Sequence, residues 1–384
     1  MIQNLFDLMI DLVKSELFGG DPVEKLELSD DEIERLLKLS KTYEIVQLVA
    51  DSLLKKAVLK KEHKEKLEKV IFHTAIRCDN LENEIENIRA LFEKEKIPFI
   101  LLKGSVLRKL YPEPWMRTSS DIDVLIREED VERATRVLQH KSYSYYSRTT
   151  HDVSYFSPGG IHIELHYETI EDFCAKESNA VLSKVWENSL QAEGACEFRM
   201  TDEMFYFYHI AHMVKHFEYG GCGIRPFIDL YILNSNEEKN VEKREELLKK
   251  GGLLAFEKEC VKLSECWFGN REKDGFDKSF EHYLINGGMY GSVENRVAID
   301  QTKKGGKLKF ILFRIFMPYK QLKDLYPVLE KRKWLTPFFE VVRWIRVIFS
   351  GRGENAVHEI KTSANMSEER KNDTEALFKK LELL

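Results

Sequence analysis

Long apolar runs, paired cysteines and a large charge of one sign are all missing from this sequence. No stretch of eighteen consecutive apolar residues occurs, so we expect no membrane-spanning helix. The net charge is only −6 over 384 residues, from 59 Lys and Arg against 65 Asp and Glu. A mildly acidic chain of this kind is not built to coat DNA or RNA through its overall charge, which argues against a nucleic acid as a template.

The six cysteines have no CxxC spacing, so they form neither a disulfide-scaffold pattern nor a zinc motif, and they fit a reducing cytoplasm. The first twenty residues lack the basic start and the small-residue cleavage site of a signal peptide. Asp7, Asp11 and Lys14 interrupt their apolar pattern, which is typical of an amphipathic helix. We therefore expect a cytoplasmic protein.

The length predicts more than one structural unit. The first part of the chain has helical spacing throughout, including a capping box at Ser29 and Glu32 and a long charged helix near residues 64–94, whose Lys and Glu run is best explained as a solvated face. No internal repeat occurs. The sequence predicts an N-terminal helical region, an α/β core, a C-terminal helical domain and a polar tail with a short terminal helix, over residues 1–95, 96–200, 201–350 and 351–384.

The chain is organised around a strand–turn–strand stretch that starts near residue 98. A buried strand at residues 98–102 runs into Lys103-Gly104-Ser105, and a later strand begins with Asp121-Ile122-Asp123. Because side chains alternate along a strand, both acids point to the same face. Two neighbouring carboxylates repel each other unless a cation lies between them, and Mg²⁺ prefers such oxygen ligands.

A third acid follows on a predicted hairpin. Strands at residues 152–156 and 161–167 flank a Ser-Pro-Gly-Gly turn, and the second strand places Glu164 on one face together with His162 and His166. If this strand lies beside the Asp-x-Asp strand, Glu164 reaches the same cation. The backbone N–H groups and the hydroxyl of Gly104-Ser105 would then offer a place for a triphosphate.

These features resemble the nucleotidyltransferase superfamily with the DNA polymerase β-like fold. The wording LLKGSVLRKLYPEPWMRTSSDIDVLI, then HIELH, then a helical H…KH…R…D segment is closer still to the bacterial "uncharacterised nucleotidyltransferase" family. The resemblance covers residues 97–233 well. It implies an α+β fold, with a mixed-sheet nucleotidyltransferase core flanked by N-terminal and C-terminal helical domains.

The resemblance also implies roles for particular residues. Asp121, Asp123 and Glu164 would be the catalytic residues and the metal ligands, holding two Mg²⁺ ions, with Mn²⁺ as a substitute. The implied nucleotide-binding residues are Lys103, Gly104, Ser105, Arg117, His212, His216 and Arg225. The residues alone also allow other roles: Ser105 caps the helix that follows the strand, Lys103 and Arg117 balance the acid charge, and Arg225 forms a structural ion pair with Asp229, one turn further along the same helix.

The predicted reaction is transfer of NMP from an NTP, ATP among them, to a hydroxyl or phosphate acceptor that the sequence does not identify. The alternative is a catalytically weak nucleotide-binding scaffold, or a partner protein in a biosynthetic pathway. The oligomeric state stays open. A zinc site at His209, His212 and His216 is disfavoured, because these residues share one helix with no acid or cysteine at ligand spacing.

The C-terminal third carries three further expectations. Residues 286–306 are Gly-rich and polar, which predicts an exposed loop. Residues 322–349 are aromatic and basic, and we expect Trp334, Phe338 and Trp344 to pack in a core, with contact to a membrane surface or a partner as the alternative. Beyond residue 351 the sequence turns polar, which predicts a tail that is mobile up to a last helix near residue 375.

Overall fold

The computed structural model describes residues 2–19, 26–169, 175–192, 194, 196–288, 291–349 and 353–384. The chain forms two compact units. The first comprises residues 1–215 and 223–278, and the second comprises residues 216–222 and 279–384. These units differ from the four ranges predicted from the sequence, which stay a prediction about domain organisation. Each unit is described by itself.

The first unit begins with four helices: α1 (Ile2–Leu17), α2 (Asp30–Thr42), α3 (Val46–Lys56) and α4 (Lys61–Lys94). The predicted capping box at the start of α2 is confirmed, because the Glu32 backbone N–H donates to Ser29 Oγ and the Ser29 N–H donates to Glu32 Oε2 at 2.9 Å. Such a cap stabilises a helix by about 1 kcal/mol. The long charged helix is also confirmed, as α4, which exposes most of its charges and buries an apolar stripe near its C-terminal end.

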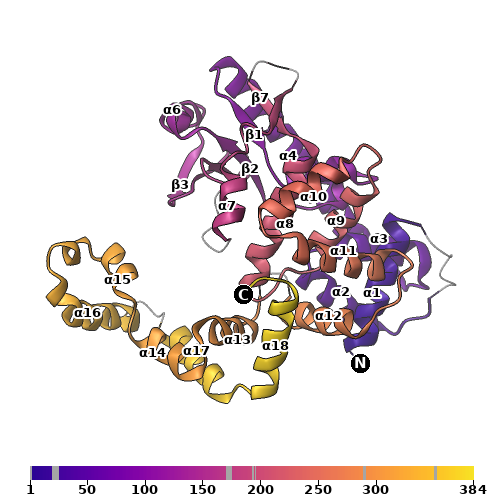
Figure 1. The fold of residues 1–384 in the computed structure, drawn as a ribbon. Coiled ribbons are helices and arrows are strands. Elements are labelled where there is room, and N and C mark those ends of the chain that lie inside the picture. The colour runs from indigo at the N-terminus through magenta and orange to yellow at the C-terminus, as the bar shows by residue number, and fades with distance from the viewer. Residues whose placement is uncertain are drawn as a thin grey trace. The chain divides into compact units, whose positions relative to one another are not determined.

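A mixed seven-stranded sheet forms the core of this unit, with strand order β3-β4-β5-β2-β1-β7-β6 (Figure 1). At its centre β2 pairs antiparallel with β1 and parallel with β5, and β1 pairs parallel with β7. The predicted hairpin is confirmed as the antiparallel pair β4 and β5. The strands are β1 (Phe99–Leu101), β2 (Asp121–Ile126), β3 (Ser144–Arg148), β4 (Asp152–Phe156), β5 (His162–His166), β6 (Ser189–Gln191) and β7 (Glu197–Met200).

One face of the sheet is apolar and is covered by α4 and α6 (Val131–His140). Ile122 and Val124 of β2 lie in this core together with Ile85 and Phe92 of α4. Each of these side chains is buried, which is worth about 1.5–3 kcal/mol per side chain relative to exposure. Because the residues of β2 alternate, burying Ile122 and Val124 on this face directs Asp121 and Asp123 to the opposite face.

No sequence pattern predicted β6 and β7, which extend the sheet at one edge. Both are short, and β7 carries a buried acid, Glu197, whose carboxylate accepts from Arg89 Nε of α4 at 2.8 Å. The remaining helices of this unit are α5 (Gly104–Leu107), η1 (Arg108–Leu110), η2 (Pro114–Met116), η3 (Glu128–Asp130), α7 (Lys176–Leu182), α8 (Asp202–Glu218), α9 (Arg225–Ser235), α10 (Val241–Lys250) and α11 (Leu254–Phe268), of which α8 runs on into the second unit.

The described part of the second unit is helical, and two expectations about it were wrong. The predicted loop at 286–306 contains α13 (Val293–Lys304), which Ser292 caps, and Asn295 at its start is buried and donates to the carbonyls of Gly220 and Tyr283. The tail predicted to be mobile up to its last helix contains a further helix, α17, whereas the predicted last helix near residue 375 is confirmed as α18. The other elements are α12 (Gly275–Gly287), which begins in the first unit, α14 (Lys307–Ile315), α15 (Tyr319–Leu325), η4 (Pro327–Glu330), η5 (Lys333–Leu335), α16 (Thr336–Phe349), α17 (Gly353–Asn365) and α18 (Glu368–Lys380).

The aromatic segment of this unit also differs from the expectation of core packing. Trp334 is 76% exposed and Phe338 is 60% exposed, so core packing was wrong for both. Trp344 is partly buried and donates its indole N–H to the carbonyl of Ile315 at 2.8 Å. Among the described residues, no helix combines the length and the apolar character that crossing a bilayer requires.

Candidate active site

The turn after β1 has an unusual backbone. Lys103 adopts φ 43° and ψ −119°, a combination that side-chain-bearing residues rarely occupy and that is concentrated at functional sites. Gly104 follows because space is short there: a Cβ at this position would lie 2.9 Å from the Cβ of Ser119. Ser105 Oγ is buried and has no hydrogen-bond partner among the described residues, so its hydroxyl is available to a ligand.

The three predicted acids meet on the face of the sheet opposite the apolar core. In the parallel register of β2 with β5, Asp121 lies opposite His162 and Asp123 lies opposite Glu164. Donor atoms of Asp121, His162 and Glu164 lie within 4.8 Å of one another, and so do donor atoms of Asp123, Glu164 and His166. The condition for a shared cation, a Glu164 strand beside the Asp-x-Asp strand, is therefore fulfilled.

Lys103 and His166 contact the most buried of these acids. Asp123 Oδ1 lies 2.8 Å from Lys103 Nζ and 2.7 Å from His166 Nε2. Burial acts to raise the pKa of Asp123, but Lys103 and His166 outweigh it, and the pKa lies below its ordinary value. Burial acts to lower the pKa values of Lys103 and His166, yet both are raised, chiefly by Asp123. These two contacts, with the charge of Lys103 as the larger contribution, thus favour the ionised form of Asp123 in the folded protein.

Asp121 has the opposite tendency. Burial, followed by the charge of Asp123, raises the pKa of Asp121 above its ordinary value. Two carboxylates one residue apart on one face therefore have pKa values pushed in different directions, because burial prevails at Asp121 and the charge of Lys103 prevails at Asp123.

The donor set fits a hard divalent cation. Carboxylate oxygens are the ligands that Mg²⁺ and Mn²⁺ prefer, and three carboxylates converge here. Two histidines, His162 and His166, flank Glu164 on the same face and add nitrogen donors to the two groups. His162 is held in place by the rings of Tyr146 and Phe156, with centroids 5.8 and 5.0 Å away.

Arg117 lies in a buried ion pair with Asp229. From the sequence, Arg225, not Arg117, was considered as the partner of Asp229. The guanidinium of Arg117 donates to Asp229 through Nε at 2.8 Å and Nη2 at 2.9 Å, and through Nη1 to the carbonyl of Thr118. The hydroxyl of Tyr111 donates to the same Asp229 at 2.7 Å. All three nitrogens of Arg117 are therefore occupied, and its predicted contact with a nucleotide stays a prediction that requires this network to open.

The alternative role considered for Arg225, an ion pair with Asp229, was wrong. The side chain of Arg225 pairs instead with Glu44, from the turn between α2 and α3. Burial lowers the pKa of Arg225, with the charge of Arg117 as the next contribution. Because Arg117 already contacts Asp229 closely, Arg225 finds its partner on a different element.

The histidines of α8 have separate surroundings. His209 is buried and its Nε2 lies 3.0 Å from the carbonyl oxygen of Pro226. The ring of His212 stacks on that of Tyr208 with centroids 6.3 Å apart. His216 belongs to the second unit. Nucleotide binding by His212 and His216 stays a prediction.

The environment of His209 predicts acid sensitivity. Burial lowers the pKa of His209, so below about pH 6.5 the unfolded chain binds a proton that the folded chain resists. Stability is therefore lost as the pH falls through this window, by at most about 1.4 kcal/mol per pH unit. In urea titrations between pH 7 and pH 5, we expect His209→Gln to flatten this loss of stability. Equal slopes for both proteins would contradict a neutral His209.

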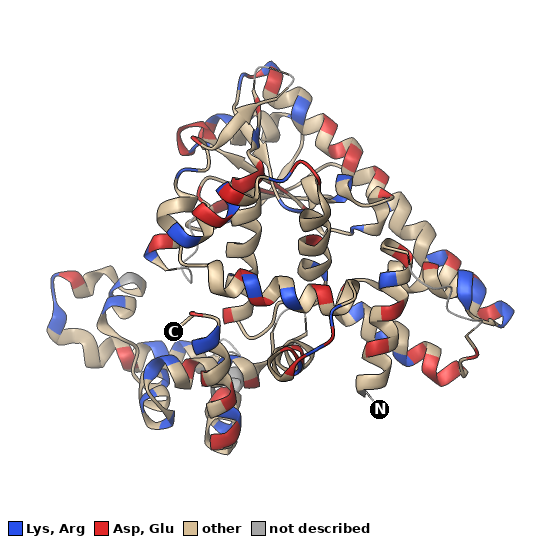
Figure 2. Ribbon diagram, turned by 45° about the vertical axis from the view of Figure 1, so that its right-hand side comes forward, with Lys and Arg blue, Asp and Glu red and all other residues tan. Residues whose placement is uncertain are grey.

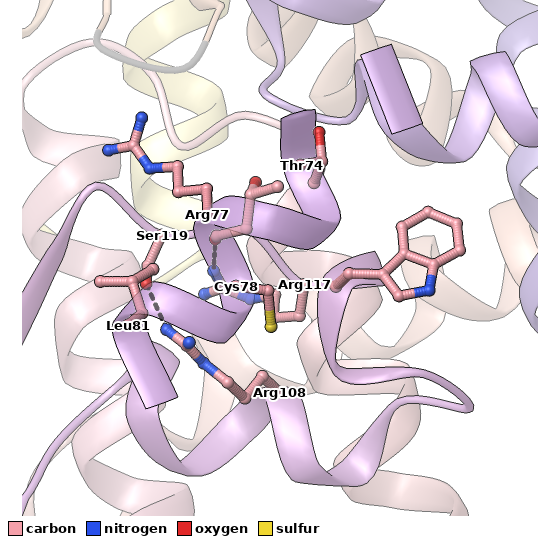
Figure 3. Close-up of a pocket in the computed structure, with 9 residues that line it drawn as sticks. Thr74, Arg77, Cys78, Leu81, Arg108, Arg117 and Ser119 are labelled. Atoms are coloured by element: carbon pink, nitrogen blue, oxygen red, sulfur yellow. Dashed lines mark hydrogen bonds between the residues drawn. The ribbon is translucent and has the colours of Figure 1, made fainter. Parts of the chain in front are cut away.

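A small pocket lies behind the Arg117–Ser119 segment, between it and α4 (Figure 3). Three arginines line it, and all three are engaged: Arg117 with Thr118 and Asp229, Arg108 with Ser119 and the carbonyl of Gly104, and Arg77 with the carbonyl of Ser120 at 3.2 Å. Arg108 therefore links the Gly-Ser turn to the segment that precedes the Asp-x-Asp strand. The lining residues are Thr74, Arg77, Cys78, Leu81, Arg108, Trp115, Arg117, Thr118 and Ser119.

Together the sheet and its site define a protein of the nucleotidyltransferase class. An Asp-x-Asp strand, a third acid on the adjacent parallel strand and a Gly-Ser turn at the edge of the same strands form that arrangement. A family model described as "Uncharacterised nucleotidyltransferase" matches residues 29–269, and the chain belongs to this family. Neither the curated proteins nor the solved structures give a match.

Three specific contacts of the site were not predicted from the sequence. His166 was placed on the correct face, but its contact with Asp123 was not expected, although a histidine two residues after a candidate ligand is a usable signal. The contact of Lys103 with Asp123 was anticipated only as general charge balance. The pairing of Arg117 with Asp229 joins residues 112 positions apart, and no local pattern indicates it.

Proposed function

We propose that the protein is a Mg²⁺-dependent nucleotidyltransferase that transfers NMP from an NTP to a hydroxyl or phosphate acceptor. One observation carries the proposal: Asp121, Asp123 and Glu164 converge on one face of the sheet, next to the turn that carries Ser105. Transfer of this kind depends mainly on positioning and on neutralising phosphate charge. When bound, the cation would supply that neutralisation and would favour ionisation of the acceptor hydroxyl.

The residues of the site would have separate roles in binding the cation and the phosphates. Asp121 and Asp123, on β2, would hold the cation from one side, and Glu164, on β5, from the other. The Gly104-Ser105 turn would bind the phosphates through the backbone N–H groups and the Ser105 hydroxyl. Leu102 donates its N–H to the carbonyl of Asp123 at 3.0 Å, so the turn and the acids are fixed to each other by the sheet.

Lys103 would act in both states of the site. Its ammonium contacts Asp123 and compensates the acid charge in the protein without ligand. Once a cation neutralises Asp123, Lys103 is free to face a phosphate oxygen of the nucleotide. Arg225 and His212 complete the proposed nucleotide-binding set within the first unit.

Nucleotide-dependent thermal stability tests the proposal. Ligand present at about 100 times its Kd stabilises the folded state by about 2.7 kcal/mol, a shift in melting temperature of about 5 °C or more. We expect one NTP to give such a shift with Mg²⁺ but not with EDTA. Glu164→Gln should reduce the shift, and Glu132→Gln, an exposed carboxylate on α6, should leave it unchanged. If no NTP shifts the folded protein, the proposed donor site is contradicted.

The alternative is a scaffold that binds nucleotide or a partner with little or no turnover. It predicts a thermal shift without release of pyrophosphate in any acceptor mixture. The presence of all three acids favours the enzyme, because a scaffold has no need to keep three carboxylates together against their mutual repulsion. A pyrophosphate assay alongside the thermal shifts separates the two functions.

A further inference from the structure

The second unit presents an apolar stripe to the solvent. On α16, Phe338, Val341, Ile345 and Phe349 follow one another at spacings of three and four residues, so they share one face of the helix. All four are exposed, Phe349 by 85%. The opposite face of α16 is the packed one, where Glu340 and Arg343 are buried and paired at 2.9 Å. An exposed apolar stripe of this kind indicates a binding surface.

The element next to α16 in the sequence extends this surface. Trp334, on η5 just before α16, is 76% exposed, and η5 contacts α16. We define the apolar surface as Trp334, Phe338, Val341, Ile345 and Phe349.

The stretch of sequence around the apolar surface is rich in basic residues. Residues 301–349 contain twelve Lys and Arg against three Asp and Glu, a net charge of +9 in a chain whose total is −6. Lys331, Arg332 and Lys333 are exposed beside Trp334, and Arg346 is exposed beside the α16 stripe. Of the acids, Glu330 lies near Lys323 and Glu340 is buried. Lys and Arg, blue in Figure 2, recur along these helices.

We propose that this face binds the surface of an anionic lipid bilayer. Apolar and aromatic side chains on one side of a helix, flanked by Lys and Arg, are what an interfacial helix requires: the stripe enters the acyl boundary and the cations meet the headgroups. A tryptophan next to three basic residues suits the bilayer interface, because its ring is apolar and its N–H is polar.

Other occupants fit the same surface less well. A nucleic acid would use the cations and could stack on Trp334, but it gives no role to exposed aliphatic side chains such as Val341 and Ile345. A second copy of the chain, packed through the same face, would bring the two sets of basic residues together, and the basic residues of this stretch outnumber its acids by twelve to three. The family match ends at residue 269, before α14 and α16, so the inference is independent of the proposed nucleotidyl transfer.

Sedimentation with vesicles tests the proposal on the full chain. We expect the protein to bind vesicles of mixed phosphatidylglycerol and phosphatidylcholine more than about tenfold more tightly than phosphatidylcholine alone, and high salt to weaken the binding. Combining Phe338→Gln, Val341→Gln and Ile345→Gln should lower binding to the mixed vesicles by about tenfold or more. Because all three residues are exposed, this variant should retain its circular dichroism and melting temperature.

A matched control removes exposed apolar residues from the first unit instead. Combining Phe72→Gln, Ile76→Gln and Leu190→Gln should leave vesicle binding unchanged. Replacing Lys331, Arg332 and Lys333 by Gln should reduce the preference for the anionic lipid. Wild-type protein that stays in solution with both kinds of vesicle would overturn the proposal. So would a dimer that the α16 variant dissociates, or equal losses of binding in the two apolar variants.

Discussion

Asp123→Asn should reduce nucleotidyl transfer by at least about 10³-fold, a loss of about 4 kcal/mol of transition-state stabilisation. Asp123 lies at the centre of the cluster. It belongs to one group of candidate metal ligands together with Glu164 and His166, and its carboxylate also contacts Lys103. Asparagine keeps the size of the side chain but lacks the negative charge that a divalent cation requires. Rates of pyrophosphate release at saturating NTP and Mg²⁺ measure the effect.

Glu197→Gln provides the matched control for this substitution. Glu197 is also a buried carboxylate of the same sheet and is also paired with a cation, Arg89. It lies on β7, outside both groups of candidate ligands. We expect Glu197→Gln to lower the free energy of unfolding while turnover stays within about twofold of the wild type. A comparable loss of turnover in both variants would show that the effect of Asp123→Asn comes from damage to the sheet.

Mn²⁺ binding gives this prediction a readout that does not depend on the acceptor. Wild-type protein should bind Mn²⁺ detectably in titrations followed by the loss of the free-ion resonance signal, and Asp123→Asn should weaken binding by at least about tenfold. If the variant binds Mn²⁺ as the wild type does but lacks turnover, Asp123 acts on the reaction in another way and its assignment as a ligand is wrong.

The central part of the fold could be predicted because its signals are local. Alternation in the Asp-x-Asp strand and in His162–His166, together with the Ser-Pro-Gly-Gly turn, predicted two strands and a hairpin that the structure contains. The face on which each acid lies follows from the same alternation. That the two strands are neighbours does not follow from it, and required the resemblance to a known family.

The predictions were wrong where they relied on amino-acid composition alone, without information on packing. Glycines near residue 290 suggested a loop, but Ser292 and Asn295 begin a helix there, and Asn295 is buried because it satisfies two backbone carbonyls. The aromatic residues of α16 suggested a core, but hydrophobicity alone does not say whether a stripe faces its own unit or the solvent. Phe338 is exposed because the packed face of α16 is the one that carries Glu340 and Arg343.

The contacts that hold the site together could not be predicted from local sequence patterns, because they also depend on packing. Asp229 lies on α9 and Arg117 precedes β2, so their pairing depends on how α9 packs against the loop before the Asp-x-Asp strand. The nearer arginine in sequence, Arg225, was the reasonable partner by helical spacing, yet it contacts Glu44. Tertiary packing decided between two arginines that the sequence treats alike.

Arg117→Met should therefore be the most destabilising single substitution near the site, lowering the free energy of unfolding by about 3–5 kcal/mol. Asp229 is 1% exposed, and without Arg117 its carboxylate keeps only the hydroxyl of Tyr111 as a close donor among the contacts described above. An ion left buried without its counter-ion costs far more than the lost attraction alone. Urea unfolding of the first unit measures the loss, and Arg35→Met, which breaks an exposed pair with Asp31, should cost less than about 1 kcal/mol.

The double variant Arg117→Met, Asp229→Leu distinguishes structure from ligand binding. Removing both charges leaves no buried ion, so we expect stability to recover to within about 1–2 kcal/mol of the wild type. If Arg117 serves only to anchor the loop before β2 to α9, the double variant should also regain the NTP-dependent thermal shift. Recovered stability without that shift would instead mean that the guanidinium leaves Asp229 to bind the nucleotide. In that case the buried pair would be the resting state of a binding residue, and Asp229 would set how readily Arg117 is released.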